Sequence, residues 1–315
     1  MPEIRIGTSG WSYPTGKGTW NGIFYPAPSL RRRGGFDELA FYAEHFDTVE
    51  INSTFYRVPE VTTARSWAQR TPPGFEFSLK LFQKFTHPAM FLKATGNDPW
   101  SLGQQDVDEF RRAIEPIATA GKLGALLAQF PASFKNEPDS RGYLGWLLEQ
   151  FRGHLVAVEL RHRSWSDRPA ETLALLDEFQ AAWVQIDEPK FRLSIRQDLL
   201  PNVRTFYYLR LHGRNAAQWW THEKSEDRYN YLYSPGELEP FAEAVEEASR
   251  RVRKAYLYTN NHFSAKSVAN AAILRHRLGQ PLTGAYPEAF VEAYPDLEGL
   301  VQLLPPPLIP SPRPS

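Results

Sequence analysis

The sequence has no cysteine among its 315 residues, which excludes disulfides, thiolate metal sites, iron–sulfur clusters and a cysteine nucleophile. It also has no excess of charge of either sign, because 36 basic residues balance 36 acidic ones. A global electrostatic attraction to nucleic acid or to an anionic membrane is therefore not expected. Any recognition of charge by this chain must be local.

Long apolar runs are absent as well. No stretch approaches the ~18 apolar residues of a membrane span, and the N-terminus MPEIRIGTSG lacks the basic segment and apolar core of a secretion signal. We therefore expect a soluble, cytoplasmic protein with no membrane partner. The missing Gly-x-Ser-x-Gly elbow disfavours a serine hydrolase. The chain ends in a proline-dense segment, which predicts an extended tail over residues 301–315 after a domain of residues 1–300.

Eight short apolar runs with strand-like alternation recur along the chain, and segments with helical periodicity lie between most of them. The strand-like runs are residues 4–9, 48–53, 75–80, 124–130, 155–161, 181–187, 205–213 and 254–261. The helical segments are residues 36–46, 62–70, 107–120, 143–151, 171–180, 236–252 and 265–278, with a weaker helical pattern at 190–200.

Strands that alternate with helices predict parallel pairing, because a parallel neighbour needs a crossover connection. Eight such units in a chain of this length predict an α/β fold, a single closed (β/α)₈ TIM barrel. The long segments 10–35 and 81–106 would be loops at the C-terminal mouth of that barrel. A doubly wound open sheet is the alternative, but no GxGxxG motif follows the first strand.

Alternation within the strands predicts a polar barrel interior. In VAVELR, Val156 and Val158 share one face of the strand, whereas Glu159 and Arg161 share the other. With the apolar residues of each strand placed against the helices, polar side chains of the other strands also face inward, although residues 254–261 show no clear phase. These inward residues are Ser9, Glu50, Asn52, Ser78, Lys80, Gln129, Gln185, Asp187, Arg210 and His212.

Seven of the predicted inward residues are ionisable: Glu50, Lys80, Glu159, Arg161, Asp187, Arg210 and His212. Isolated buried charges are costly, so these groups must pair, contact a ligand or lie in a solvated cup. Because TIM-barrel active sites lie at the carboxyl ends of the strands, we predict a charged cup at the mouth. Its candidates for acid–base catalysis are Glu50, Glu159, Asp187 and His212.

Two other interpretations of this cluster remain open. It could be a structural ion-pair network that closes the top of the barrel, with three acids neutralising three bases. It could also hold a divalent metal, since carboxylates and imidazole suit Mg²⁺, Mn²⁺ or Zn²⁺. Three cationic neighbours already supply positive charge, and no HExxH spacing occurs. We therefore predict neither a metal nor another cofactor.

The predicted mouth loops supply further candidates. His87, His162 and His262 are candidates for acid–base work or for simple solvation. The run Arg31–Arg33 is predicted to be a solvated surface segment. Aromatic side chains on these loops either pack beneath them or stack on a sugar or nucleobase: Trp11, Tyr13, Trp20, Phe24, Tyr25, Phe55, Tyr56, Trp165, Trp219, Trp220, Tyr229 and Tyr231.

Seven ordered segments resemble the signature segments of the domain-of-unknown-function family 72, the YecE-like proteins. They are GTSGWSY, VEINSTFY, the stretch from Lys80 to FTHP, LAQFPASF, VAVELRHRSW, YLRLHG and TNNHFSAKSVANA. The resemblance spans residues 4–280 and implies a (β/α)₈ barrel of unassigned activity. Carried over one residue at a time, the family pattern falls on Ser9, Gly10, Trp11, Tyr13, Glu50, Asn52, Thr54, Phe55, Tyr56, Lys80, Thr86, His87, Gln129, Pro131, Glu159, Arg161, His162, Trp165, Asp187, Arg210, His212, Gly213, Asn260 and Asn261.

Two departures from the family pattern are visible. The first loop carries an insertion, TGKGTW, and the segment HFSAKS has no glycine near the start of the last helix, where the family commonly has one. With the interior pattern and the resemblance together, the predicted substrate contacts are Ser9, Trp11, Tyr13, Asn52, Tyr56, Lys80, His87, Gln129, Arg161, Trp165, Arg210, Asn260 and Asn261.

These observations favour an enzyme that acts on a small anionic or polyhydroxylated ligand, of phosphate, carboxylate or sugar type, by acid–base chemistry in the cup. Lys80, Arg161 and Arg210 would hold its negative charge. One alternative is a nucleic-acid-binding or AP-endonuclease-like protein, in which mouth aromatics stack on bases. Another is a non-catalytic barrel that binds a small-molecule ligand. The sequence does not predict the reaction or the oligomeric state.

Overall fold

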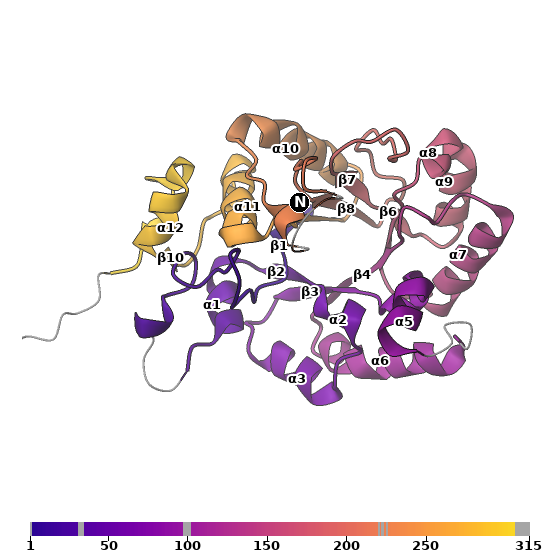
Figure 1. The fold of residues 1–315 in the computed structure, drawn as a ribbon, viewed down its shortest axis with the longest axis horizontal. Coiled ribbons are helices and arrows are strands. Elements are labelled where there is room, and N and C mark those ends of the chain that lie inside the picture. The colour runs from indigo at the N-terminus through magenta and orange to yellow at the C-terminus, as the bar shows by residue number, and fades with distance from the viewer. Residues whose placement is uncertain are drawn as a thin grey trace, which may run out of the picture.

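The computed structural model describes residues 2–30, 35–96, 102–219, 221, 224 and 226–305. Its centre is a ring of parallel strands with helices around it (Figure 1). The strands pair in the order β6-β5-β4-β3-β2-β1-β9-β8-β7. They are β1 (Glu3–Ser9), β2 (Thr48–Ile51), β3 (Glu76–Lys80), β4 (Leu123–Gln129), β5 (Val156–Glu159), β6 (Ala182–Trp183), β7 (Gln185–Asp187), β8 (Phe206–Leu211) and β9 (Lys254–Thr259).

The strands β6 and β7 are two halves of one barrel strand, which Val184 interrupts. The backbone N–H of Val184 donates to the carbonyl oxygen of Val158 at 2.9 Å, and β6 and β7 pair with β5 and β8. The ring therefore closes through residues 182–187. The eight predicted strands and the α/β barrel of TIM type are confirmed.

Helices cover the ring from outside, and a long helix follows each barrel strand except the sixth within the described residues. The seven segments with clear helical periodicity all form helices. The long loop over residues 10–35 carries a short 3-10 helix, Pro28–Leu30, and the loop over 81–106 carries α4 and α5. The helices are α1 (Glu38–His45), α2 (Ser53–Tyr56), α3 (Val61–Gln69), α4 (Gln83–Thr86), α5 (Pro88–Thr95), α6 (Gln104–Thr119), α7 (Pro138–Gln150), α8 (Ser164–Asp167), α9 (Pro169–Glu178), α10 (Pro235–Ser249), α11 (Lys266–Arg277) and α12 (Glu288–Ala293).

The weaker helical prediction, residues 190–200, is wrong. This segment forms turns and an isolated antiparallel bridge between Ser194 and His162. The Gln197 side chain accepts from the N–H of Ile186 at 3.1 Å and donates to the carbonyl of Val184 at 2.7 Å. A segment without a helix, hydrogen-bonded to the backbone of the sixth strand through Gln197, thus takes the place of a crossover helix.

The register of the strands defines the barrel interior. Paired residues on neighbouring parallel strands project to the same side of the sheet. Ser9 pairs with Glu50, and Gln129 pairs with Glu159, so these four side chains share the inward face, as predicted.

The strand β9, which has no clear phase in the sequence, places two tyrosines in the interior. The Tyr258 hydroxyl lies 2.9 Å from Ser78 Oγ, and the Tyr256 hydroxyl donates to Glu76 at 2.6 Å. Glu76 also accepts from Lys254 Nζ at 2.6 Å. Polar groups in mutual contact therefore fill the lower barrel, where aliphatic layers are the usual solution.

The predicted phase of the sixth strand is wrong. Ile186 pairs with Arg210, whose side chain faces the interior, so the next residue, Asp187, faces outward. Asp187 there accepts from Arg214 Nε at 2.8 Å and from the Tyr233 hydroxyl at 2.7 Å. Its prediction as an inward catalytic group is thereby corrected.

The described chain continues beyond the predicted boundary at residue 300. The strands β10 (Ala285–Tyr286) and β11 (Gln302–Leu303) form a separate two-stranded parallel sheet beside the barrel. The rest of the predicted tail, residues 306–315, lies outside the described residues. The predicted surface run Arg31–Arg33 lies outside them too.

A left-handed turn precedes α11 at the place where the sequence lacks the family glycine. Ser264 has φ 54° and Ala265 has φ 63°, values that favour glycine. The turn is held by its surroundings, because the N–H of Ser264 donates to the carbonyl of Gly18 at 3.0 Å and its carbonyl accepts from the Tyr294 hydroxyl. Serine and alanine thus adopt the strained conformation in place of glycine.

This turn generates a stability prediction. Ser264→Gly should increase the free energy of unfolding by about 1 kcal/mol, because glycine removes the steric cost of the left-handed conformation. Ser66→Gly, inside α3, is the matched control and should decrease stability by about 0.5 kcal/mol. Urea denaturation of both variants measures the effect. A loss of stability in Ser264→Gly would contradict it.

Candidate functional site

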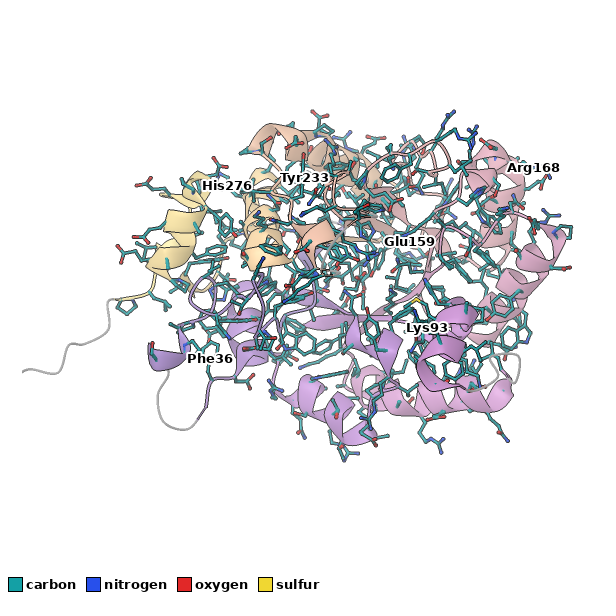
Figure 2. All side chains as sticks on the ribbon, viewed as in Figure 1. Phe36, Lys93, Glu159, Arg168, Tyr233 and His276 are labelled. Carbon is teal, nitrogen blue, oxygen red and sulfur yellow. The ribbon has the colours of Figure 1, made fainter. Side chains whose placement is uncertain are left out.

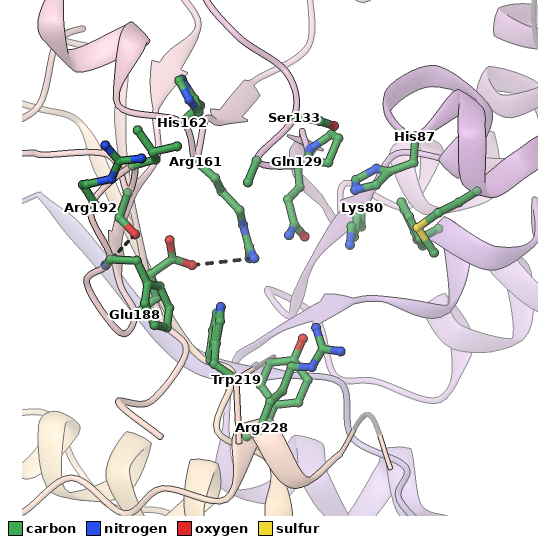
Figure 3. Close-up of a pocket in the computed structure, with 18 of the residues that line it drawn as sticks. Lys80, His87, Gln129, Ser133, Arg161, His162, Glu188, Arg192, Trp219 and Arg228 are labelled. Carbon is green, nitrogen blue, oxygen red and sulfur yellow. Dashed lines mark hydrogen bonds and ion pairs between the residues drawn. The ribbon is translucent and has the colours of Figure 1, made fainter. Parts of the chain in front are cut away.

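A pocket of about 790 Å³ opens at the end of the barrel where the strands have their carboxyl ends. Lys80, Gln129 and Arg161 lie at or just after the ends of β3, β4 and β5, and Figure 3 shows their side chains converging on the pocket. Loops form its walls. The lining residues are Phe55, Tyr56, Lys80, His87, Met90, Gln129, Pro131, Ala132, Ser133, Arg161, His162, Glu188, Phe191, Arg192, Leu193, Ser194, Trp219, Arg228 and Tyr229.

The charged groups of this pocket are mainly basic. Lys80, Arg161, Arg192 and Arg228 contribute to its lining, whereas Glu188 is the only acidic residue among the described lining residues. A concave site with basic walls concentrates field lines and attracts anions. This pocket therefore gives an overall neutral chain a local concentration of basic side chains.

Lys80 ends β3 in the inward phase, and its environment is unusual for a lysine. Its Nζ atom lies 3.8 Å from the centroid of the Phe55 ring, and it makes no hydrogen bond or ion pair within the described part of the chain. Burial, together with the positive charges of Arg210 and Arg161, lowers the pKa of Lys80 to about 7, and Glu159 offsets this only in part. A substantial fraction of the amine is therefore neutral at neutral pH.

Arg161 is held in place from below and from one side. Its Nε donates to Glu159 Oε1 at 2.8 Å, and its Nη2 lies 3.4 Å from His212 Nε2. Its Nη1 lies 3.6 Å from Glu188 Oε2, the contact dashed in Figure 3. A guanidinium fixed in this way is preorganised for an anion in the pocket.

Three charged lining residues, Glu188, Arg192 and Arg228, were missed by the sequence analysis, and Glu188 is the acidic one. It follows β7 and faces the pocket, because it shares the inward phase of Ile186. Burial raises the pKa of Glu188, Glu159 adds to this, and Arg161 offsets it in part. Glu188 could have been predicted if the apolar residues of the sixth strand had been placed on the inward face, because Glu188 lies two residues after Ile186.

A buried ion-pair network lies beneath the pocket, centred on Arg210. Arg210 donates to Glu50 from Nε at 2.9 Å and from Nη2 at 2.6 Å, and its Nη1 donates to Glu159. Glu50 also accepts from Ser9 Oγ and from the Tyr208 hydroxyl, each at 2.7 Å. Every carboxylate oxygen in this network therefore has a partner.

Four predicted cup residues lie below the pocket and do not line it. Glu50, Glu159 and His212 are 0% exposed and Arg210 is 1% exposed, and Figure 2 shows Glu159 at the centre of the molecule. Burial raises the pKa of Glu159, but the charges of Arg210 and Arg161 outweigh it and hold that pKa well below its ordinary value. Glu159 is thus a permanent carboxylate that orients two arginines.

His212 is neutral in this network. Burial, assisted by Arg210 and Arg161, lowers the pKa of His212 to about 3, although Glu159 opposes the shift. Its Nε2 lies 3.2 Å from Arg210 Nη1, and its Nδ1 lies 2.9 Å from the Asn260 amide nitrogen. The ring is therefore a positioning element between the network and Arg161.

Five of the predicted substrate contacts line the pocket: Tyr56, Lys80, His87, Gln129 and Arg161. The aromatic residues Phe55, Trp219 and Tyr229 and the loop residue His162 also line it. Burial and the charges of Lys80 and Arg161 lower the pKa of His87 to about 3, so its ring is neutral. The pocket thus combines aromatic and neutral polar side chains with its basic ones.

The other predicted contacts lie elsewhere: Ser9, Trp11, Tyr13, Asn52, Trp165, Arg210, Asn260 and Asn261. Trp165 is fully buried and donates to the carbonyl of Phe134 at 2.9 Å. Tyr13 stacks on His262 with 4.2 Å between ring centroids. These aromatic residues pack the mouth loops instead of lining the pocket. Trp220 lies outside the described residues.

The described residues form neither a metal-site cluster nor a membrane-spanning helix. Across the described ranges, no group of three or more His, Asp or Glu side chains has the arrangement of a metal site. Of the acids considered as metal ligands, Glu50 and Glu159 face the barrel interior, whereas Asp187 faces outward. No helix in the same ranges is long and apolar enough to cross a membrane.

The sequence profile of the family described as "Protein of unknown function DUF72" matches residues 5–291. The chain belongs to the DUF72 family. Its relatives include the UPF0759 protein YunF of Bacillus subtilis, 25% identical over 90% of this chain and 98% of that protein. The UPF0759 protein YecE of Escherichia coli is 28% identical over 50% of this chain and 48% of that protein.

Solved DUF72 structures share the barrel. A DUF72 family protein from Thermotoga maritima has 32% identity and a TM-score of 0.72, covering 88% of this chain and 100% of that one. A DUF72 family protein from Enterococcus faecalis has 23% identity and a TM-score of 0.75, covering 90% of this chain and 100% of that one. The resemblance stated from seven sequence segments is therefore confirmed.

The network beneath the pocket generates a stability prediction. Arg210→Met should lower the free energy of unfolding by about 3–5 kcal/mol, because it leaves Glu50 buried without a cation and Glu159 with Arg161 alone. Tyr208→Phe, which removes one hydrogen bond to Glu50, is the control and should cost about 1–2 kcal/mol. Guanidinium denaturation distinguishes them. Equal losses in the two variants would mean that Arg210 does not carry the network.

Lys80 generates a prediction about pH. Its pKa is about 7 in the folded chain against an ordinary 10.5, so burial of the ammonium destabilises the fold fully below pH 7, and this penalty fades as pH rises toward 10.5. Lys80→Met should therefore stabilise the protein at pH 6 by on the order of 2 kcal/mol.

The gain in Lys80→Met should largely vanish at pH 9.5. Denaturant titrations of wild type and variant at both pH values measure the difference. Lys93→Met, at an exposed position on α5, is the control and should show little dependence on pH. A gain in Lys80→Met that is the same at pH 6 and pH 9.5 would contradict the lowered pKa.

Proposed function

We propose that this protein is an enzyme that binds a small anionic substrate in the mouth pocket and transfers protons there by acid–base catalysis. The observation that carries the proposal is the position of Arg161. Its guanidinium is oriented by Glu159 from below, at 2.8 Å, and lines a pocket whose only described acid is Glu188.

Anion binding is supported by the balance of charge around Arg161. Each carboxylate of the buried network is already engaged by Arg210 or Arg161. Glu188 Oε2 is 3.6 Å from Arg161 Nη1 and accepts no hydrogen bond from the described residues. The guanidinium therefore retains capacity for a carboxylate or phosphate, which it binds through paired N–H groups.

Acid–base catalysis is supported by Glu188. Burial raises the pKa of this carboxyl group, so it can carry a proton closer to neutral pH than an ordinary glutamate does. It faces the same pocket as the anion-binding guanidinium. The aromatic residues Phe55, Trp219 and Tyr229 leave apolar wall for the organic part of a substrate. This assigns catalysis to Glu188 instead of the buried Glu50 and Glu159.

The test of anion binding uses inorganic phosphate and a dicarboxylate, malonate, as probes. Calorimetric titration should show binding to wild type and a loss of at least ~10-fold in affinity for Arg161→Gln. Arg163→Gln is the matched control, because Arg163 is two residues away and pairs with Asp167 on the surface. Equal affinity in wild type and Arg161→Gln would remove the proposed site.

The test of catalysis uses carboxylated and phosphorylated metabolites that shift the melting temperature, each followed by NMR for conversion. Glu188→Gln should bind a converted compound but turn it over ~10²-fold more slowly or worse. Binding without conversion of any hit would favour the non-catalytic barrel. Retention on single-stranded DNA that falls steeply with salt would favour the nucleic-acid alternative.

A further inference from the structure

We propose that Lys80 is a nucleophile that condenses with the carbonyl group of an aldehyde or ketone substrate to form an imine. This inference rests on the proposed function, because the anionic group of that substrate would be bound by Arg161. It adds the chemical class of the substrate: a keto acid or a phosphorylated aldehyde or ketone.

The first support is the lack of a polar partner for Lys80. Other buried cations near the barrel are engaged: Lys84 Nζ donates to Asp106 at 2.7 Å, Lys122 Nζ to the carbonyl of Thr71 at 2.6 Å, and Arg210 to two glutamates. Lys80 Nζ has only the Phe55 ring at 3.8 Å within the described residues. An amine in an ion pair is held in its protonated form by its partner. The Lys80 amine has no such partner among the described residues.

The second support is the electrostatic environment. Arg210 and Arg161 face Lys80 from β8 and from the end of β5, and Glu159 and Glu50 are already committed to those arginines. Burial and the two arginines lower the pKa of Lys80 to about 7. A neutral amine is the nucleophilic form, and neighbouring cations in an apolar pocket are an established way to produce it.

The third support is access. Lys80 lines the 790 Å³ pocket together with Gln129 and Arg161, and Figure 3 shows it on the opposite side of Arg161 from Glu188. A substrate whose anion contacts Arg161 can therefore place a neighbouring carbon toward the Lys80 amine. The Phe55 ring beneath Nζ would also stabilise the cationic iminium that forms.

The proposed step needs only Lys80, the carbonyl substrate, Glu188 and water. The Lys80 lone pair adds to the carbonyl carbon, and a proton moves from nitrogen to oxygen to give a carbinolamine. Protonation of its hydroxyl, by Glu188 or by a water that Glu188 protonates, allows water to leave as the nitrogen lone pair forms the C=N bond. The product is a protonated imine, which withdraws electrons from the bond to the adjacent carbon.

The experiment is reductive trapping. The full chain is incubated with sodium cyanoborohydride and pyruvate, dihydroxyacetone phosphate or glycolaldehyde, and the modified lysines are identified by peptide mass spectrometry. Lys80 should be modified at least ~10-fold faster than the exposed Lys93, and its rate should rise through pH 7 as the neutral amine forms. Lys80→Arg should lose this modification, and Lys84→Arg, four residues away, should keep it.

The outcomes separate this inference from the proposed function. If Lys80 reacts no faster than Lys93 with all three probes, the imine inference is wrong, and phosphate binding that still depends on Arg161 leaves the proposed function standing. If Lys80 is trapped with pyruvate equally well in wild type and Arg161→Gln, the imine inference stands and anion binding by Arg161 falls. Glycolaldehyde has no anionic group and should be insensitive to Arg161→Gln.

Discussion

The structure of the mouth depends on one interaction, the contact of Arg210 with Glu50 and Glu159. The three residues come from β8, β2 and β5, so a single guanidinium connects distant strands across the barrel axis. None of the three is more than 1% exposed. Removing charges from water is costly, and the cost is recovered only when every polar atom has a partner. Ser9 and Tyr208 complete that requirement for Glu50.

The same network sets the orientation and the electrostatic environment of the groups in the pocket. Glu159 uses one oxygen for Arg210 and the other for Arg161, so it fixes the pocket-lining guanidinium of Arg161 from below. Burial and the charge of Arg210 lower the pKa of Lys80, Arg161 adds to the shift, and Glu159 and Glu50 offset it only in part. In the proposed function, the buried pairs thus act indirectly, through the position and the charge environment of the pocket groups. This combines the two interpretations of the cluster, a structural network and a functional cup.

Period-two alternation predicted most of the fold and part of the site, and its failures share one physical cause. Seven strands have helices on their outer faces, so their apolar residues face outward. The sixth strand is instead covered by residues 190–200 and by Arg214. Its outer face can therefore be polar, with Gln185 and Asp187, and its inner face apolar, with Ile186. The wrong helix at 190–200 and the wrong position of Asp187 are consequences of the same local architecture.

Depth along the barrel axis was beyond the reach of the sequence. Alternation predicts that Glu50, Glu159 and Lys80 point inward. It does not predict that Glu50 and Glu159 lie below the pocket whereas Lys80 lines it. That depends on the stagger of the strands and on loops from distant segments, which bring Trp219 and Tyr229 over the mouth. Family resemblance did not resolve it either, because signature residues include both packing groups such as Trp165 and pocket groups such as Lys80.

The net charge of the pocket and the network does not change when a proton moves from Lys80 to Glu188. Glu50 and Glu159 balance Arg210 and Arg161, which leaves Lys80 and Glu188. The net charge of these six groups is the same whether Lys80 is an ammonium and Glu188 a carboxylate, or both are neutral. Burial lowers the pKa of Lys80 to about 7 and raises that of Glu188, so each shift favours the neutral form of its own group. In the proposed imine formation, the neutral form of Lys80 is the nucleophile and the protonated form of Glu188 is the acid that carbinolamine dehydration requires, and conversion of both groups to their neutral forms adds no net charge to the interior.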